Sequence, residues 1–440
     1  MPELLTKNQI LVSNSSINYK VVNFLGEGGQ GEVYRATSNH GEFAIKWYND
    51  KSATSEQFQA LIKIISFGPP AGNFLWPIEV IRMDGVKNYG YVMPLREKRF
   101  KGLIDLMNGK INPSFNNLII ASCKLVDRFL QLHTKGLCYR DINFGNVFFD
   151  PNNGEVLICD CDNVTVDNQY KTHFIYGTPK FMAPEIVRGE GLPNGDTDRF
   201  SLAVLLFYMF VVSHPLDGKN ETKIHCFDQA AMKKLYGDNP IFIFDPNNDT
   251  NRPDPNIHKN ALLYWELYPK FFKDIFVKAF TDGIHDPING RVRETEWRYA
   301  LLKLKNSLIY CQNCGSENFY DENHKSPIIC WNCKKNVKIP PILQIGSLKI
   351  MLNYNTIIYK HHLDHVSYDF KEKIAKLSPN PRDNSVWGLT NISNRNWKVL
   401  RKDGKESTIE PNQTVAILLG QIIDFGIAKG EIINPINHRQ

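Results

Sequence analysis

Apolar and polar residues alternate over the first part of the chain as they do in β-strands. Residues 17–48 hold three alternating runs punctuated by Gly and Asn, which predicts consecutive antiparallel strands. Helical spacing follows over Ser55–Ile65 and again over Phe115–Leu132, with a further strand at Tyr89–Pro94 between them. Phe200–Val212 is apolar on every face, so this segment predicts a buried helix.

The pattern changes after residue 310. Residues 262–304 predict helices, and a cysteine-rich stretch then leads through Pro340–Pro341 into residues 341–440. This last part holds short alternating runs separated by turn sequences such as Asp-Gly, which predicts a small β-sandwich. Because 440 residues exceed one compact core, we expect two or three domains.

Composition adds limits on the class of protein. Hydrophobic residues make up 42% and charged residues 22%, and the net charge of +6 is too small to argue for nucleic-acid binding. The longest apolar run, residues 200–212, falls short of the ~20 that span a bilayer, and the first residues lack the pattern of a signal peptide. Of the nine cysteines, five lie outside two Cys-x₂-Cys pairs, and this odd, scattered set argues against a disulfide framework. We therefore expect a cytoplasmic protein with no membrane partner.

A glycine-rich segment lies between two of the predicted strands, with the pattern Gly-x-Gly-x-x-Gly over residues 26–31. This spacing lets backbone N–H groups approach phosphate oxygens without interference from a Cβ. A dinucleotide-binding loop has the same pattern but opens a helix, whereas this loop returns into a strand. A later apolar strand ends at Lys46, from which a side chain can reach the α- and β-phosphates of a nucleotide.

A set of polar residues follows at 139–146, in the sequence Tyr-Arg-Asp-Ile-Asn-Phe-Gly-Asn. Asp141 is a candidate for the group that orients the proton of an attacking hydroxyl, and Asn146 for a magnesium ligand through its amide oxygen. The apolar run Val156–Cys159 predicts a short strand that brings Asp160 to the same site. There its carboxylate would bridge Mg²⁺ to the phosphates.

In this order the motifs resemble the eukaryotic-type (Hanks-type) serine/threonine protein kinases over about residues 17–305. Gly-Thr-Pro at 177–179 and Ala-Pro-Glu at 183–185 continue the series. The Gly-Thr-Pro element is similar to serine/threonine kinases and not to tyrosine kinases. By this resemblance, Thr178 would hydrogen-bond toward Asp141.

The resemblance implies an α+β, two-lobed fold, with residues 1–95 and 96–305 holding ATP and Mg²⁺ in the cleft between them. Asp141 would be the catalytic base, assisted by Lys46 and Asn143, and Met93 would lie behind the adenine ring. The residues implied to contact nucleotide or metal are Gly26, Gly28, Gly31, Val33, Ala44, Lys46, Met93, Asn146 and Asp160.

The family also implies contacts outside the cleft. Glu185 would pair with an arginine late in the domain, for which Arg291 is the candidate, and Asp198 would brace the catalytic loop. Arg140, next to Asp141, places the chain with kinases whose activation loop is phosphorylated, because a phosphate there would pair with the arginine. The candidate acceptors are Thr165, Tyr170, Thr172 and Tyr176.

Two departures from the family pattern concern the catalytic and metal-binding loops. Asn143 stands where the family usually has a lysine that helps to neutralise the γ-phosphate. Asp-Cys-Asp at 160–162 replaces Asp-Phe-Gly, which leaves open whether Asp160 or Asp162 is the metal ligand. A literal Asp-Phe-Gly at 424–426 lies in the strand-rich tail, and we interpret it as a coincidence at the end of a strand.

A third departure concerns the helix glutamate that should pair with Lys46. Glu56 is the acidic residue of the predicted helix at 55–65, but it lies at the start of that helix. A glutamate in a first turn is equally explained by the favourable helix dipole. The sequence therefore leaves the partner of Lys46 open.

Four cysteines form two pairs, Cys311-x₂-Cys314 and Cys330-x₂-Cys333, separated by 15 residues. Two tight turns at this spacing present four thiolates tetrahedrally, which predicts a structural Zn²⁺ with no open catalytic position. The segment at 306–338 resembles a zinc ribbon.

The complete order, with a β-rich domain at 341–440, resembles bacterial kinases of tellurite-resistance or stress gene clusters, encoded with a PP2C-type phosphatase and a von Willebrand A-type protein. The motifs at 141–149 and 181–189 carry this likeness. Three functions remain: a protein kinase, a pseudokinase scaffold that binds ATP and presents the ribbon and β-domain, and a small-molecule kinase. The Ala-Pro-Glu segment speaks against the last, because in the family it supports a protein substrate.

Overall fold

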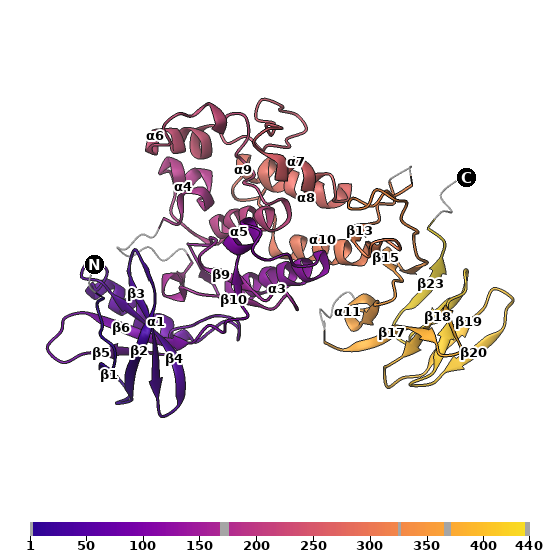
Figure 1. Ribbon diagram of the computed structural model, residues 1–440, viewed down its shortest axis with the longest axis horizontal. Coiled ribbons are helices and arrows are strands. Elements are labelled where there is room, and N and C mark those ends of the chain that lie inside the picture. Colours follow the sequence, from indigo (N-terminus) through magenta and orange to yellow (C-terminus); the bar gives the residue numbers. More distant parts are fainter. Residues whose placement is uncertain (1–2, 168–175, 324–326, 365–370, 436–440) are drawn as a thin grey trace. The chain divides into compact units, whose positions relative to one another are not determined.

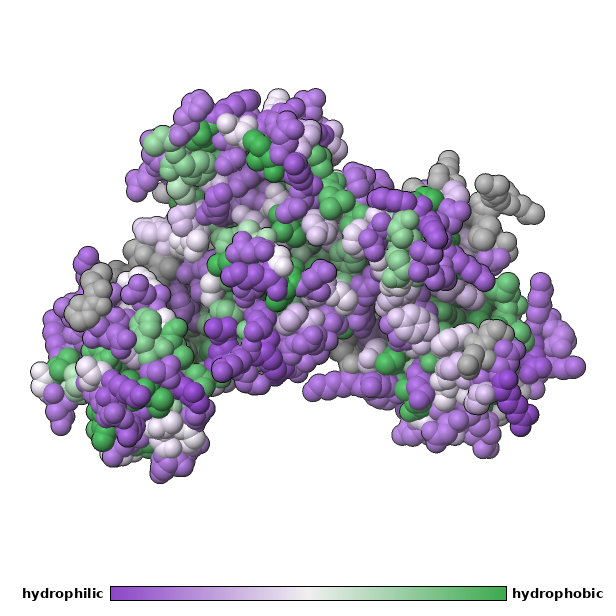
Figure 2. All heavy atoms as spheres, viewed as in Figure 1, coloured by the Kyte–Doolittle hydropathy of each residue, from purple (hydrophilic) through white to green (hydrophobic). Residues whose placement is uncertain are grey.

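The computed structural model describes residues 3–167, 176–323, 327–364 and 371–435 (Figure 1). They divide into two compact units, the first formed by Met1–Glu266 and Lys273–Tyr299 and the second by Leu267–Phe272 and Ala300–Gln440. Within these described ranges, no helix is both long enough and apolar enough to cross a membrane. Hydrophilic side chains cover most of the face shown in Figure 2.

The first unit begins with a closed barrel of strands in the order β1-β2-β3-β4-β6-β5. The antiparallel pairs β2–β3 and β3–β4 confirm the consecutive strands that the sequence predicts at 17–48. Helix α1 (Ser55–Phe67) lies against the barrel (Figure 1), and the Thr54 side chain caps it by accepting from the Gln57 amide. The strands are β1 Ile10–Ser13, β2 Asn18–Gly28, β3 Gly31–Ser38, β4 Gly41–Tyr48, β5 Glu79–Arg82 and β6 Tyr89–Pro94.

Helices dominate the rest of the first unit. Helix α5 (Gly195–Val211) is buried along its whole apolar run, as its sequence predicts, and Asn194 closes its N-terminus with a capping box. The helices are α2 Leu103–Met107, α3 Phe115–Thr134, α4 Pro184–Arg188, α6 Gln229–Met232, α7 Lys259–Trp265 and α9 Asp282–His285. Helices α8 Lys270–Phe280 and α10 Glu294–Asn306 each have residues in both units. The short strands are β7 Lys101–Gly102, β8 Leu137–Cys138, β9 Val147–Phe149, β10 Val156–Ile158 and β11 Thr165–Val166.

The second unit contains a hairpin, β12 (Leu308–Tyr310) and β13 (Glu317–Phe319), and two antiparallel sheets. The sheets have the orders β15-β14-β23-β22-β19-β20 and β16-β17-β18-β21, and both contribute to one buried core around Trp397. The elements are β14 Ile342–Ile345, β15 Leu348–Met351, β16 Ile357–Tyr359, α11 Lys360–Leu363, β17 Lys373–Asn380, β18 Asp383–Asn391, β19 Trp397–Leu400, β20 Glu406–Ile409, β21 Thr414–Ala416, β22 Ile422–Asp424 and β23 Lys429–Ile433.

Two details of the second unit bear on the sequence interpretation. Cys311 and Cys330 share a buried cluster with Ile342 and Met351 of the sheet domain, so the cysteine segment is packed against that domain and does not stand alone. The literal Asp-Phe-Gly at 424–426 ends β22 and turns into β23, with the glycine at φ +79°. Its place at a strand end agrees with the interpretation of that motif as a coincidence.

The predicted pair of Glu185 and Arg291 is present. Arg291 Nη2 lies 2.9 and 2.8 Å from the two carboxylate oxygens of Glu185, and its side chain is 2% exposed. The pair ties the segment that begins α4 to the loop before α10. An unpaired guanidinium at this depth would be strongly unfavourable.

We expect Glu185→Ala to lower the free energy of unfolding by about 3–5 kcal/mol, because it leaves the Arg291 charge buried without its carboxylate. Urea-induced unfolding followed by tryptophan fluorescence measures the loss. Lys278→Ala is the matched control, since its pair with Glu296 is about 40% exposed, and should cost less than about 1 kcal/mol. Equal losses in the two variants would contradict a structural role for the buried pair.

Candidate active site

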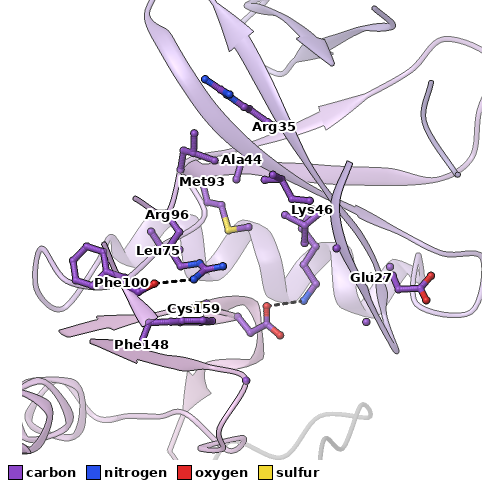
Figure 3. A pocket seen from close by; sticks show the side chains of 18 of the residues that line it. Glu27, Arg35, Ala44, Lys46, Leu75, Met93, Arg96, Phe100, Phe148 and Cys159 are labelled. Atoms are coloured by element: carbon purple, nitrogen blue, oxygen red, sulfur yellow. Dashed lines mark hydrogen bonds and ion pairs between the residues drawn. The ribbon is translucent and has the colours of Figure 1, made fainter. Parts of the chain in front are cut away.

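A cavity of about 1280 Å³ lies in the first unit, between the barrel and the residues that follow it (Figure 3). This is larger than the ~300–1,000 Å³ of typical ligand pockets, so it has room for a nucleotide and a reacting group beside it. Its wall includes most of the site residues that the sequence predicts: Gly26, Gly28, Gly31, Val33, Ala44, Lys46, Met93, Asp141 and Asp160.

One end of the cavity is apolar. In Figure 3, Ala44 and Met93 of the barrel lie on one side, and Phe148 and Cys159 lie on the other. The guanidinium of Arg96 stacks on the Phe148 ring at 4.1 Å. A slot with these apolar walls and one guanidinium suits a planar aromatic base. Sequence reasoning identified Ala44 and Met93 but missed Phe148, which follows Asn146 by two residues and lies on β9.

Asp141 is held by hydrogen bonds from three neighbouring side chains. Asn143 Nδ2 and Thr178 Oγ1 donate to Asp141 Oδ1 over 2.9 and 2.8 Å, which confirms the predicted Thr178 contact. Asn146 Nδ2 donates to the Asp141 carbonyl over 2.8 Å and to Oδ2 over 3.2 Å. Because these bonds use the amide nitrogen of Asn146, its amide oxygen is left for a cation.

Asn143 and Asn146 were both predicted as site residues, but neither lines the cavity. Asn143 is buried, and its Oδ1 accepts from the Gly145 amide over 2.7 Å while its Nδ2 donates to Asp141. It therefore fixes the conformation of the catalytic loop and the direction of the Asp141 carboxylate. A neutral amide cannot supply the positive charge that the family's lysine gives.

Lys46 is buried and lies among three side chains. Its Nζ is 2.9 Å from Asp162 Oδ2, 2.8 Å from Gln30 Oε1 and 3.5 Å from Asp160 Oδ1. Burial alone would lower the pKa of Lys46, but the carboxylates of Asp162 and Asp160 outweigh it and raise the pKa. The lysine is therefore held as a cation at the wall of the cavity.

The two aspartates of the Asp-Cys-Asp segment have different surroundings. The Asp160 side chain is 37% exposed and lines the cavity, and burial raises its pKa. The Asp162 side chain is fully buried and accepts from Tyr48 Oη over 2.6 Å and from Tyr91 Oη over 2.9 Å. Burial would raise the pKa of Asp162, but Lys46 and the two tyrosines lower it. Of the two aspartates, Asp160 is thus the one that faces the cavity.

Glu56 does not supply the partner of Lys46. It is exposed in the first turn of α1, and in the described chain the ion pairs of Lys46 are those with Asp160 and Asp162. Two departures from the family pattern, taken together, indicate that Lys46 pairs with Asp162 and not with a helix glutamate. The position of the motif's glycine carries a second carboxylate, and the helix has no acidic residue beyond its first turn.

Residues 79–264 match the protein kinase domain family. The chain carries a protein kinase domain. The match begins at β5, so the glycine loop and Lys46 precede it, but they line the same cavity as Asp141 and Asp160.

Individual relatives are distant. A probable serine/threonine-protein kinase of Dictyostelium discoideum is 24% identical over 197 residues, which are 44% of this chain and 12% of the relative. The cell cycle serine/threonine-protein kinase of Saccharomyces cerevisiae is 24% identical over 219 residues, or 49% and 31%. A CBL-interacting serine/threonine-protein kinase of Arabidopsis thaliana is 29% identical over 122 residues, or 27% of each chain. The chain therefore spans less than a third of the length of these relatives.

The catalytic loop of the kinase domain is anchored by Asp198, as predicted. Its carboxylate accepts from the backbone amides of Tyr139 and Arg140, over 2.5 and 2.8 Å. Behind it lies His133, with Nε2 3.1 Å from Asp198 and Nδ1 2.6 Å from Glu294. Burial would lower the pKa of His133, but hydrogen bonds to the two carboxylates raise it to about 9. Sequence reasoning missed His133 and Glu294, because the pair is 161 residues apart.

The charged His133 should make the stability of the kinase domain pH-dependent. Its pKa is higher in the folded state than in the unfolded state, so the stabilisation is complete below about pH 6.5 and is lost as the pH rises through about 9. We expect the contribution of His133 to the free energy of unfolding of wild type to fall by about 3 kcal/mol between about pH 6.5 and about pH 9. Urea unfolding at pH 6, 8 and 10 measures it. Between pH 6 and 8, below the range in which the buried thiols of Cys138, Cys159 and Cys161 contribute because burial raises their pKa, His133→Gln should remove most of the slope. An unchanged slope there would contradict the assignment.

The structure describes Arg140 and two of the four candidate phosphorylation sites. Arg140 Nε donates to the Asn163 carbonyl over 2.7 Å, at a backbone φ of +73°. Thr165 lies in β11, and Tyr176 is 48% exposed. The candidates Tyr170 and Thr172 lie outside the described residues. The pairing of Arg140 with a phosphate remains a prediction.

The four cysteines of the second unit meet in one cluster. Their Sγ atoms all lie within 4.8 Å of one another. Gly315 and Lys334 adopt left-handed conformations, with φ of +73° and +61°, in the two turns that carry the pairs. Hydrogen bonds with Ser316 lower the pKa of Cys314 to about 6. The arrangement offers four sulfur ligands to one metal ion.

Proposed function

We propose that this protein is a serine/threonine protein kinase that transfers the γ-phosphate of ATP to hydroxyl groups of protein substrates. The observation that carries the proposal is the single cavity whose wall includes the glycine loop, Lys46, Asp141 and Asp160. The apolar slot beside Met93 would take the adenine ring. The opposite end, where Asp141 lies, would take the phosphates and the substrate hydroxyl.

Each polar residue has a distinct part in this proposal. Lys46 would orient the α- and β-phosphates, and the glycine loop would cover them with its backbone amides. Asp141, directed by its three hydrogen bonds, would orient the substrate hydroxyl and take its proton. Asp160 and the amide oxygen of Asn146 would hold Mg²⁺, which neutralises charge on the phosphates. Positioning supplies most of the rate in such reactions.

The alternative is a pseudokinase that binds ATP and uses the second unit to reach partners. Its motivation is Asn143, which lacks the charge of the family's lysine. Against it stands the hydrogen-bonded Asp141, whose three donors would serve no purpose in a scaffold.

Thr178 beside Asp141 favours serine and threonine as acceptors of the phosphate. The Glu185–Arg291 pair anchors the Ala-Pro-Glu segment, which in the family supports a protein substrate, so a metabolite is a less suitable acceptor.

We expect Asp141→Ala to lower magnesium-dependent autophosphorylation by about 10²–10⁴-fold, because it removes the group that handles the hydroxyl proton. Transfer of label from ATP to the protein measures it. Asp403→Ala, on an exposed turn of the second unit, is the control and should label like wild type. Equal labelling of Asp141→Ala and wild type would contradict the assignment. Absence of labelling in wild type that still binds ATP would favour the scaffold.

We also infer that the four clustered cysteines hold one structural Zn²⁺. Four thiolates complete a tetrahedral shell, so the ion would stabilise the turns and would not act in catalysis. The amides of Asn318 and Asn332 lie 3.7 and 3.9 Å from Cys330 and Cys314 Sγ, where they can donate to thiolates.

Purified protein should contain about one zinc per chain by elemental analysis. Cys314→Ser should lower the zinc content and the unfolding temperature of the second unit, because the ion's binding energy is part of the folding energy. Cys226→Ser is the matched control, since Cys226 is an exposed free cysteine outside the cluster, and should keep its zinc. Full stability of Cys314→Ser after chelation would contradict a structural metal.

The order of a kinase domain, a cysteine hairpin and two β-sheets also supports the proposal of a bacterial stress-cluster kinase. On that reading a PP2C-type phosphatase and a von Willebrand A-type protein are its candidate partners in the cytoplasm. Co-purification of these proteins with the full chain tests the idea.

A further inference from the structure

Lys46 takes its principal carboxylate partner from an unusual place in the chain. In protein kinases the corresponding lysine pairs with a glutamate of the helix that follows its strand. Here that helix is α1, and its Glu56 is exposed. The bidentate partner is Asp162, which lies two residues after Asp160 and contacts Nζ over 2.9 and 3.1 Å.

The environment of Asp162 is built for a charged carboxylate. Its side chain is fully buried, and each oxygen accepts from Lys46 and from one tyrosine hydroxyl, Tyr48 on Oδ2 and Tyr91 on Oδ1. Both tyrosines are themselves buried, on β4 and β6. This carboxylate accepts four hydrogen bonds from three residues, which stabilises its charge. An unpaired carboxylate at this depth would be strongly unfavourable.

The backbone around Asp162 brings it to this place. Asp160 adopts a left-handed conformation, with φ +46° and ψ +42°, and a 3₁₀ turn at Cys161–Asn163 follows. The turn leaves Asp160 at the cavity wall, buries Cys161 and directs Asp162 toward Lys46. The family's glycine at this position has no side chain with which to make the contact.

Helix α1 reaches Lys46 indirectly. Gln57, in its first turn, donates from Nε2 to Tyr48 Oη over 3.1 Å, and that hydroxyl donates to Asp162. The connection from helix to lysine therefore runs through Gln57, Tyr48 and Asp162. In the family pattern one helix glutamate makes the same connection directly.

We propose that Asp162 is a positioning residue that holds Lys46 toward the nucleotide phosphates in place of a helix glutamate, and that Gln57 and Tyr48 couple α1 to it. This inference rests on the proposed kinase function. Without Asp162, the nearest carboxylate to Lys46 Nζ is Asp160 at 3.5 Å. The existing pair with Asp160 would then be the carboxylate contact left to Lys46, and the lysine would compete with Mg²⁺ for that aspartate.

Two substitutions test the proposal in the full chain. Asp162→Asn keeps the size of the side chain and removes its charge, and we expect kcat to fall at least tenfold and the Mg²⁺ concentration for half-maximal rate to rise at least threefold. Tyr48→Phe keeps the buried ring and removes the hydroxyl, and we expect kcat to fall about threefold to tenfold. Glu56→Gln is the comparison variant and should stay within twofold of wild type.

Binding measurements separate this proposal from that of the kinase function. With Mg²⁺ present, Asp162→Asn should bind ATP at least threefold more weakly than wild type but bind adenosine within twofold, because Lys46 and Mg²⁺ meet only the phosphates. A general loss of folding would weaken both ligands. This ratio is measurable even if wild type transfers no phosphate, in which case the kinase proposal fails and the ratio still decides the role of Asp162.

Three results would overturn the proposal. The first is Asp162→Asn within twofold of wild type in kcat, in Mg²⁺ dependence and in the ratio of ATP to adenosine affinity. The second is a loss in Glu56→Gln as large as that in Asp162→Asn. The third is an unchanged Tyr48→Phe, which would remove α1 from the connection. Thermal unfolding of each variant establishes that the folded protein is compared.

Discussion

A buried negative charge at Asp162 determines how the active-site cavity is organised. A carboxylate removed from water is stable only if its oxygens are fully hydrogen-bonded and an opposite charge lies close by. The barrel satisfies both needs, with Lys46 and Tyr48 on β4 and Tyr91 on the neighbouring β6. One group therefore fixes the Asp-Cys-Asp segment at 160–162 against strands β4 and β6 of the barrel. The same contact settles which aspartate remains exposed to the cavity.

The parts of this architecture that depend on local pattern could be predicted from the sequence. The β2–β3–β4 meander and the buried helix α5 follow from periodicity. The contacts of Thr178 and Arg291 join distant residues and were implied by the family resemblance. Contacts between distant residues that the resemblance did not imply could not be predicted. The Lys46–Asp162 pair joins positions 116 apart, and His133–Glu294 joins positions 161 apart. The local pattern around His133 and Glu294 does not indicate that they pair. For Lys46 the signals are the second carboxylate of Asp-Cys-Asp and the lack of an acidic residue later in the helix.

The second unit shows the same limit. The spacing of the cysteines predicts a four-sulfur site, and the Sγ atoms do meet. The sequence does not reveal that this segment shares its apolar interior with the first strands of the sheet domain, because Ile342 and Met351 are ordinary strand residues by pattern. A metal ion there would stabilise the edge of a larger domain as well as its own turns.

The proximity of Asp160 and Asp162 has a consequence for small molecules aimed at the cavity. A compound that pushed the Asp-Cys-Asp segment at 160–162 outward would have to break the contacts of Asp162. In this protein that movement would carry Asp162 out of its enclosure, and would leave Lys46 and two buried tyrosines without their acceptor. Compounds that displace the segment should therefore bind weakly. Compounds confined to the slot between Met93 and Phe148 leave the segment undisturbed. Asp162 thus limits which compounds can bind in the cavity, although a compound in the slot does not contact it.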